Sequence, residues 1–260
     1  MQQKDLGLLK EFLDEKYFLY NHKKFIETDP ICIPHQFTKK QDIEIAAFFA
    51  ATIAWGNRQS IIKNATKLMQ LMDYSPHSFV TNAIAKEIQV FSKFVHRTFN
   101  GDDCIFFIES LKHIYKNNTS LEILFSKGIQ IEDETIKNGI ISFREDFFSI
   151  KHPARTQKHV SNPLKNSSSK RLCMFLRWMV RRDRAGVDFG IWKNIKSSQL
   201  CLPLDVHTGN VSRKLGLLNR TQNDWQAVEE VTNLLRQLDS KDPVKYDFAL
   251  FGLGVFEGFK

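Results

Sequence analysis

The sequence has few of the residues that crosslink or break a fold. Its 260 residues include 4 Cys, 12 Gly and 7 Pro. The cysteines are scattered and form no Cys-x-x-Cys pair, which argues against a zinc ribbon, an iron–sulfur cluster or a redox pair. The eight histidines form no His-Glu-x-x-His motif, so we expect no metal site. With 42% hydrophobic and 25% charged residues, the composition also excludes a collagen-like or disordered chain.

Long hydrophobic runs are missing as well. The longest nearly apolar run, Ile45 to Trp55, has 11 residues, whereas a membrane-spanning helix needs about 20. The first residues, Met1 to Asp5, lack the basic and then apolar build of a signal peptide. We therefore expect a cytoplasmic protein with no membrane partner, long enough to bury a large core without a metal or a crosslink.

Acidic residues are scarce in one stretch. Between Lys151 and Arg184 there are ten Lys and Arg residues and one acid, Asp183. Because the formal net charge of the chain is +8, the remaining residues together are nearly neutral. A localised positive segment is typical of a surface that binds a polyanion, and six of the ten are Arg, the better phosphate ligand. A solvated helix with extra lysines is the alternative.

Nearly every periodic segment has helical spacing, and no strand pair is convincing. A first helix carries Leu9 to Tyr17, and a capping box of Thr38 and Gln41 predicts a second helix that runs to about Trp55. Thr221 is expected to open a long helix near the C-terminus. The pattern predicts an all-α protein with about a dozen helices.

The stretch with the strongest chemical signal begins after a loop. Residues 151 to 169 lose their apolar periodicity, and a helix is expected from about Ser169 to Asp183. Lys170 then lies in the first turn, at the positive end of the helix dipole and beside Arg171, and both effects disfavour the ammonium form. A neutral lysine amine is a nucleophile. An ordinary exposed lysine at a helix start is the alternative interpretation.

Asp205 is placed to cap a second chemically relevant helix, which ends near Leu215 with Gly216 following. A capping carboxylate stays ionised. It could stabilise positive charge on a sugar ring or take a proton from a lysine. The alternative is a plain N-cap with no chemical role.

These residues carry a resemblance to a known superfamily. Lys170 followed by Pro203-Leu204-Asp205-Val206-His207 resembles the helix-hairpin-helix DNA glycosylases. Thr52 to Arg58 with Ile62 to Thr66, and Pro243 to Gly252, are similar to two further segments of that superfamily. The match is best to the archaeal 8-oxoguanine branch. It is closer still to an uncharacterised bacterial family of unknown function, and it covers about residues 40 to 254 in three patches.

The resemblance implies a helix-hairpin-helix glycosylase-like, two-lobed helical bundle. Residues 1–260 would form one domain in which the N- and C-terminal helices share a lobe, while the central helices and a hairpin around 160–185 line the cleft. The implied activity is a DNA-repair N-glycosylase and AP lyase, which removes a damaged base, such as an oxidised purine, from duplex DNA through a lysine Schiff base. The resemblance further implies a monomer that associates with the nucleoid. It implies no cofactor other than a possible monovalent cation at the hairpin.

The resemblance also assigns roles to single residues. Lys170 matches the nucleophile and Asp205 the catalytic aspartate. The substrate-base pocket would contain Asp247, Phe251 and Trp55. The DNA-phosphate contacts would be Asn166, Ser167, Ser168, Ser169, Arg171, His207 and Arg213. Asn57 and Arg58 are candidates for the wedge that fills the gap left by the flipped base.

The sequence departs from the superfamily at three of these places. The hairpin glycines are replaced by Asn166, Ser167 and Ser168, the wedge glutamine falls at Gly56, and Phe251 stands for a tryptophan. Two other functions therefore stay open. One is a nucleic-acid-binding protein without chemistry, and the other is an enzyme that uses the lysine on a small-molecule carbonyl.

Overall fold

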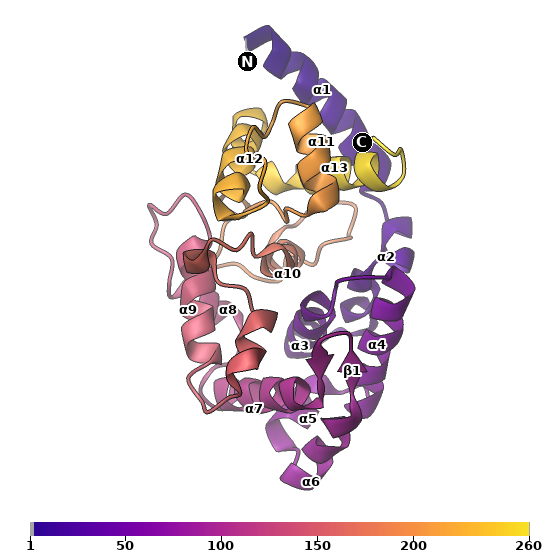
Figure 1. Cartoon of the computed structure of the whole chain (residues 1–260), viewed down its shortest axis with the longest axis vertical. Coiled ribbons are helices and arrows are strands. Elements are labelled where there is room, and N and C mark those ends of the chain that lie inside the picture. The colour runs from indigo at the N-terminus through magenta and orange to yellow at the C-terminus, as the bar shows by residue number, and fades with distance from the viewer. Residues whose placement is uncertain (1–2, 260) are drawn as a thin grey trace. The chain divides into compact units, whose positions relative to one another are not determined.

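The computed structural model describes residues 3–259 and is 63% helix and 2% strand, which confirms the predicted all-α class. Within these residues, no helix is long and apolar enough to cross a membrane. The first helices, shown in Figure 1, are α1 (Gln3–Tyr20), α2 (Lys24–Thr28), α3 (Lys40–Thr52), α4 (Arg58–Leu71), α5 (Pro76–Asn82), α6 (Ala85–Ile88) and α7 (Gly101–Asn117). The later ones are α8 (Glu122–Ser126), α9 (Lys137–Phe147), α10 (Lys170–Val180), α11 (Val206–Lys214), α12 (Trp225–Leu238) and α13 (Tyr246–Val255). Short 3-10 turns connect several of them.

The chain divides into two compact units that each have a core. Unit 1 comprises Met1–Phe25, Ile131–Lys137 and Asn162–Lys260, and unit 2 comprises Ile26–Gln130 and Asn138–Ser161. Unit 1 therefore contains both α1 and the helices from α10 to α13. Three separate stretches of sequence build it.

Aromatic rings form the centre of unit 2. Phe107 of α7 packs edge-on against Phe147 of α9, with ring centroids 4.8 Å apart, and stacks on Phe48 of α3 at 5.5 Å. All three side chains are buried. Such pairs contribute beyond the area that they bury, so the phenylalanine-rich helices hold this unit together.

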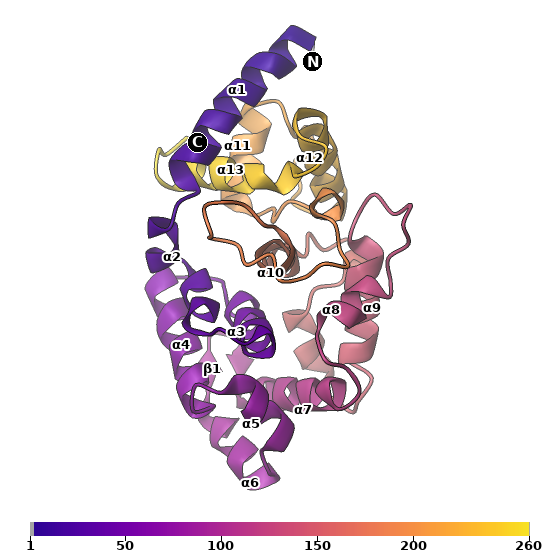
Figure 2. The ribbon, with the colours of Figure 1, turned by 180° about the vertical axis from the view of Figure 1, so that it is seen from behind.

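In unit 1, α13 packs against both α1 and α11, and the views of Figures 1 and 2 agree on this arrangement. Gly252 permits a close approach of α13 to α1. A Cβ atom at this position would come within 2.1 Å of the Tyr20 ring. The N-terminal helix is thus fitted closely against the last helix of the chain.

Two predicted helix starts are wrong. The N-cap of α3 is Lys39 without a side-chain bond, and Gln41 donates instead to the carbonyl of Thr119, so Thr38 and Gln41 form no capping box. The long C-terminal helix α12 is capped by Asp224 and not by Thr221, because the Asp224 carboxylate accepts from the Ala227 amide at 3.0 Å.

The sequence analysis also missed a hairpin. The strands β1 (Val95–His96) and β2 (Phe99–Asn100) pair antiparallel, with His96 opposite Phe99. Two residues per strand are too few to show a periodic pattern, so no alternation could reveal it.

Candidate active site

Lys170 is the first residue of α10 and follows a tight loop. Asn166 and Ser169 both have left-handed backbone angles, with φ of 58° and 50°. Residues other than glycine adopt this region uncommonly, and such positions gather at functional sites. Ser169 is the N-cap of α10 and makes no side-chain capping bond, so the backbone of the loop directs Lys170.

The loop is attached to the start of α12. The Asn166 side-chain amide donates to Asp224 Oδ2 at 3.0 Å, and the Trp225 amide donates to the Asn166 carbonyl at 3.2 Å. Ser167 forms an isolated β-bridge with Asp224, while Ser168 is half-buried. The four predicted hairpin residues, 166 to 169, therefore form one anchored turn.

Asp205 is the N-cap of α11, as predicted from the sequence. Its Oδ1 atom accepts from the amides of His207 and Thr208 at 2.9 and 3.0 Å, and the Thr208 hydroxyl completes the capping box by accepting from the Asp205 amide. These bonds fix the orientation of the carboxylate through one oxygen. The second oxygen, Oδ2, is turned toward Lys170.

The two predicted catalytic side chains meet. Lys170 Nζ lies 3.8 Å from Asp205 Oδ2, and the side chains are 27% and 26% exposed. At this separation the groups attract each other without the geometry of a direct hydrogen bond. An amine and a carboxylate that solvent can reach, held at this distance, suit a nucleophile with a nearby proton acceptor.

Asp247 of α13 is the third charged residue of this group. Its side chain is buried, and burial raises the pKa of the carboxyl to about 6, with Arg177 opposing the rise. The Asp205 carboxylate raises this pKa further, while Lys170 lowers it. Asp247 thus responds to the charges of both predicted catalytic residues and is mostly ionised at neutral pH.

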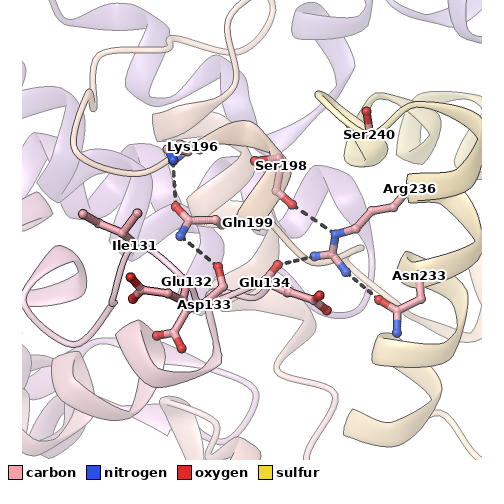
Figure 3. A pocket seen from close by; sticks show the side chains of 10 residues that line it. All are labelled: Ile131, Glu132, Asp133, Glu134, Lys196, Ser198, Gln199, Asn233, Arg236 and Ser240. Carbon is pink, nitrogen blue, oxygen red and sulfur yellow. Dashed lines mark hydrogen bonds between the residues drawn. The ribbon is translucent and has the colours of Figure 1, made fainter.

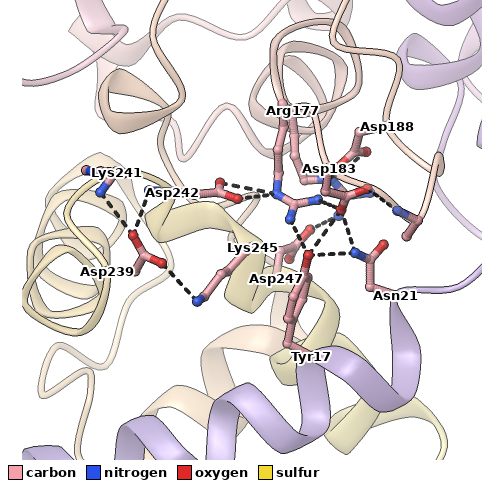
Figure 4. A network of polar contacts seen from close by, with 12 residues as sticks. Tyr17, Asn21, Arg177, Asp183, Asp188, Asp239, Lys241, Asp242, Lys245 and Asp247 are labelled. Atoms are coloured by element: carbon pink, nitrogen blue, oxygen red, sulfur yellow. Dashed lines mark hydrogen bonds and ion pairs between the residues drawn. The ribbon is translucent and has the colours of Figure 1, made fainter.

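A buried network of arginines and aspartates supports Asp247 (Figure 4). Arg177 of α10 bonds to Asp247 through Nη1 and to Asp188 through Nε, the latter at 3.2 Å. One helical turn later, Arg181 bonds to Asp188 and to Asp242. Both arginines are nearly inaccessible to solvent, with 4% and 1% exposed, so buried carboxylates balance their charges.

Sequence reasoning missed this network because it counted both arginines as part of a positive surface. A signal was present: Arg177 and Arg181 flank the run Trp178-Met179-Val180 and follow Phe175 and Leu176. An arginine inside an apolar run can be buried where carboxylates pair with it.

Phe251 lies one helical turn after Asp247, and the two residues share a face of α13. Its ring is half-buried and packs edge-on against Phe25 at 6.0 Å and Phe256 at 6.2 Å. The structure therefore brings Phe251 close to Asp247 along the helix.

The other predicted phosphate contacts in unit 1 differ in their surroundings. His207 is exposed in the first turn of α11. Burial lowers the pKa of the Arg171 guanidinium to about 10, which leaves it charged at neutral pH. Arg213 donates to the carbonyls of Arg220 and Thr221, each at 2.8 Å, so it holds this loop.

The remaining predicted site residues belong to unit 2. Trp55 is half-buried, with its ring edge-on to His96 at 5.1 Å and stacked on His159 at 6.1 Å. Asn57 is the N-cap of α4 and accepts from the Ser60 amide at 3.1 Å, and Arg58 is the first residue of that helix.

A separate pocket of about 450 Å³ in unit 1 contains none of the predicted site residues (Figure 3). Arg236 lines it and donates to the carbonyls of Ser198 at 3.1 Å and Glu134 at 2.8 Å. The Gln199 side chain likewise donates to the carbonyl of Asp133. These polar groups hold two segments of the unit together.

Comparison with known proteins places the chain in a family. Residues 29–256 match the family model described as Protein of unknown function (DUF2400). Because the match spans most of the chain, the protein belongs to this family. A search of curated proteins and a search of solved structures returned no match.

Proposed function

We propose that this protein is a DNA N-glycosylase and AP lyase on a helix-hairpin-helix glycosylase-like fold, acting on a damaged base in duplex DNA. The observation that carries the proposal is the 3.8 Å separation of Lys170 Nζ from Asp205 Oδ2. These residues are 35 positions apart in the sequence, and the resemblance to the glycosylases picks out this pair. The anchored turn of residues 166 to 169 supports the same assignment.

In the proposed reaction, neutral Lys170 attacks the sugar C1′ atom. The new C1′–N bond forms as the glycosidic bond breaks, and the electron pair of that bond leaves with the base, which takes up a proton. Asp205 stabilises the oxocarbenium-like charge on the sugar and accepts a proton from the lysine amine. Opening of the sugar ring then gives an imine, from which the 3′ phosphate is eliminated.

The base itself would be taken out of the helical stack before the reaction. Asp247, fixed by Arg177, would accept hydrogen bonds from the purine edge, and Phe251 would stack on the base. Both residues come from one face of α13. An oxidised purine, which carries an additional N–H donor, fits an ionised acceptor.

Borohydride trapping tests the proposal. Incubation with a duplex that contains an abasic site or 8-oxoguanine, in the presence of borohydride, is expected to give a covalent protein–DNA adduct. Lys170→Ala should abolish the adduct, whereas Lys165→Ala, which removes an exposed lysine of the preceding turn, should not change its yield. Asp205→Asn should slow trapping by about 10²-fold or more, the scale of a lost proton acceptor.

An adduct that persists in Lys170→Ala would remove this lysine from the reaction. Salt-sensitive duplex binding without adduct or released base would instead identify a nucleic-acid-binding protein without chemistry. The replacement of the hairpin glycines by Asn166, Ser167 and Ser168 favours that second function, because side chains hinder close approach of a phosphate to the backbone.

A further inference from the structure

Two segments of unit 2 that contact each other contain no acidic residue. No Asp or Glu occurs from Ala54 to Met72, which contains α4, or from Ile88 to Gly101, which contains β1 and β2. The two segments are in contact, because the Asn64 side chain of α4 bonds to His96 Nδ1 at 3.0 Å and His96 Nε2 is 3.3 Å from the Trp55 carbonyl. Their basic residues define what we term the α4–hairpin surface: Arg58, Lys63, Lys67, Lys93 and Arg97.

The cations of this surface differ from Lys40 and Arg155, two cations of unit 2 that pair with carboxylates. Lys63, Lys67, Lys93 and Arg97 are exposed, and within residues 3–259 none of them pairs with a carboxylate. By contrast, Lys40 pairs with Glu122 at 2.6 Å and Arg155 with Asp103 at 2.7 Å. Positive charge without internal compensation is what a polyanion would neutralise.

Arg97 is held in an unfavourable backbone conformation. It is the first residue of the two-residue turn between β1 and β2 and has a φ of 55°. Hairpins favour glycine at such a position, because a side chain there strains the backbone. An arginine in this position indicates that the side chain has a use that the fold alone does not require.

Gly56 makes room for this arginine. A Cβ atom at Gly56 would lie 2.5 Å from Arg97 Nη1 and 3.3 Å from its Cδ, so the guanidinium passes directly over the Gly56 backbone. The Arg155 side chain donates to the Thr98 carbonyl at 2.8 Å and steadies the turn. The hairpin therefore presents one exposed guanidinium over Gly56, next to Trp55 in the sequence.

We infer that the α4–hairpin surface binds the phosphate backbone of duplex DNA, with Arg97 of the hairpin turn as one of its contacts. The identity of the polyanion rests on the proposed function, but the inference does not depend on the chemistry of Lys170. A membrane surface is less suited, since helices that lie on lipid insert apolar side chains. The exposed positions of α4 are all polar, namely Gln59, Ser60, Lys63, Lys67 and Gln70, whereas the hairpin segment exposes Val90 and Val95.

The salt dependence of binding tests this inference. Affinity for an undamaged 20-base-pair duplex is measured by fluorescence anisotropy over a range of salt concentrations. Each lost phosphate contact reduces the magnitude of the negative slope of log K against log salt by about 0.9. Arg97→Gly should lower it by about 1 and the double variant Lys63→Ala/Lys67→Ala by about 2, each with a several-fold loss of affinity at 0.1 M salt. Arg97→Gly relaxes the turn, so impaired folding should not obscure the result.

The matched control is Lys39→Ala/Lys116→Ala, which removes two exposed lysines of unit 2 outside this surface. It should leave the slope unchanged. If the surface variants bind with the same slope as this control, the inference is overturned while the proposed function stands. If wild-type protein binds no duplex, both fail, and if binding follows the inference but no adduct is trapped, only the proposed function fails. Binding to anionic vesicles that depends on these residues, with duplex binding unaffected, would also overturn the inference.

Discussion

At the scale of single residues, the electrostatics of the site converge on Asp247. Its carboxylate is buried, contacts Arg177, and responds to both Lys170 and Asp205. Burial and the nearby Asp205 charge hold its pKa, about 6, above its ordinary value of 3.8. The folded state therefore binds this proton more tightly than the unfolded state does. Through linkage, the stability contributed by the bound proton is present at low pH and lost as the pH rises through 6.

This linkage predicts the pH dependence of an Asp247→Asn variant. Between pH 5 and pH 7 the titration of Asp247 should lower the free energy of unfolding of the wild-type protein by about 1 kcal/mol, and the variant should lack this decrease. Urea unfolding at the two pH values measures it. The difference between the proteins is the informative quantity, since the other titrating groups are common to both. Parallel pH profiles would show that Asp247 does not titrate in this range.

The sequence was sufficient to place Lys170 and Asp205, because each stands at a helix start beside recognisable neighbours. It was insufficient for Arg177, whose partners Asp188 and Asp247 lie 11 and 70 residues away. Whether an arginine lies on the surface or in the interior depends on which carboxylates lie near it in the folded structure. The local composition of the sequence does not contain this information.

At the scale of elements, α1 and α13 are in close contact at Gly252. A Cβ atom built at Gly252 would lie 2.1 Å from the Tyr20 ring, whereas a Cβ atom built at Gly7 of α1 would have no neighbour within 4 Å. Gly252 is therefore tightly packed and Gly7 has free space around it. Both are within helices.

We expect Gly252→Ala to destabilise the protein by about 1–3 kcal/mol through overpacking. The same substitution at Gly7 should stabilise it by about 0.5–1 kcal/mol, because alanine is the better helix former and meets no neighbour. Chemical denaturation of both variants gives the comparison. Equal effects at the two positions would mean that α1 is not packed as described.

Arg181 connects α10 to α1, because its Nη2 atom donates to the Tyr17 hydroxyl at 2.8 Å. Asp188 and Asp242 raise its pKa although burial opposes this, so it stays charged. Arg181→Ala should cost about 3–5 kcal/mol, because Asp242 loses its arginine partner and Asp188 keeps only Arg177. Arg182 is the next residue and is exposed. The Arg182→Ala variant should therefore change the free energy of unfolding by no more than about 0.5 kcal/mol. Thermal unfolding measures the melting temperatures of the two variants. Equal melting temperatures would contradict this interpretation.

The helices with long amphipathic periods, such as α4, α7 and α12, could be predicted because their buried side chains recur every three to four residues. Their starts were harder to predict. Thr38 had the right residue type for a cap, but the Gln41 side chain is used by the Thr119 carbonyl instead. Whether a side chain caps a helix therefore depends also on competing partners that are close in space but distant in the sequence.

At the scale of the whole molecule, the chain forms two units with separate cores. The residues of unit 2 all lie between positions 26 and 161, whereas unit 1 requires both ends of the chain. A truncation at the C-terminus therefore removes part of unit 1 alone.

A chain that ends at Asp242 lacks α13, which packs against α1 and α11. We expect α1 and α11 to lose protection in amide hydrogen exchange, while α3 and α7 of unit 2 stay protected, because each unit can open independently of the other's core. Mass-spectrometric exchange on the truncated chain measures this. Loss of protection in every helix would show that the two cores form only together.

The packing of α1 against α13 also determines when α1 can reach its folded position during synthesis on the ribosome. α1 is made before its partner α13, which begins more than 220 residues later, and this corresponds to on the order of 10–50 s of translation. All of unit 2 emerges during that interval. Until α13 leaves the exit tunnel, the apolar face of the nascent α1, including Leu13 and Tyr17, lacks the helix against which it packs in the folded protein.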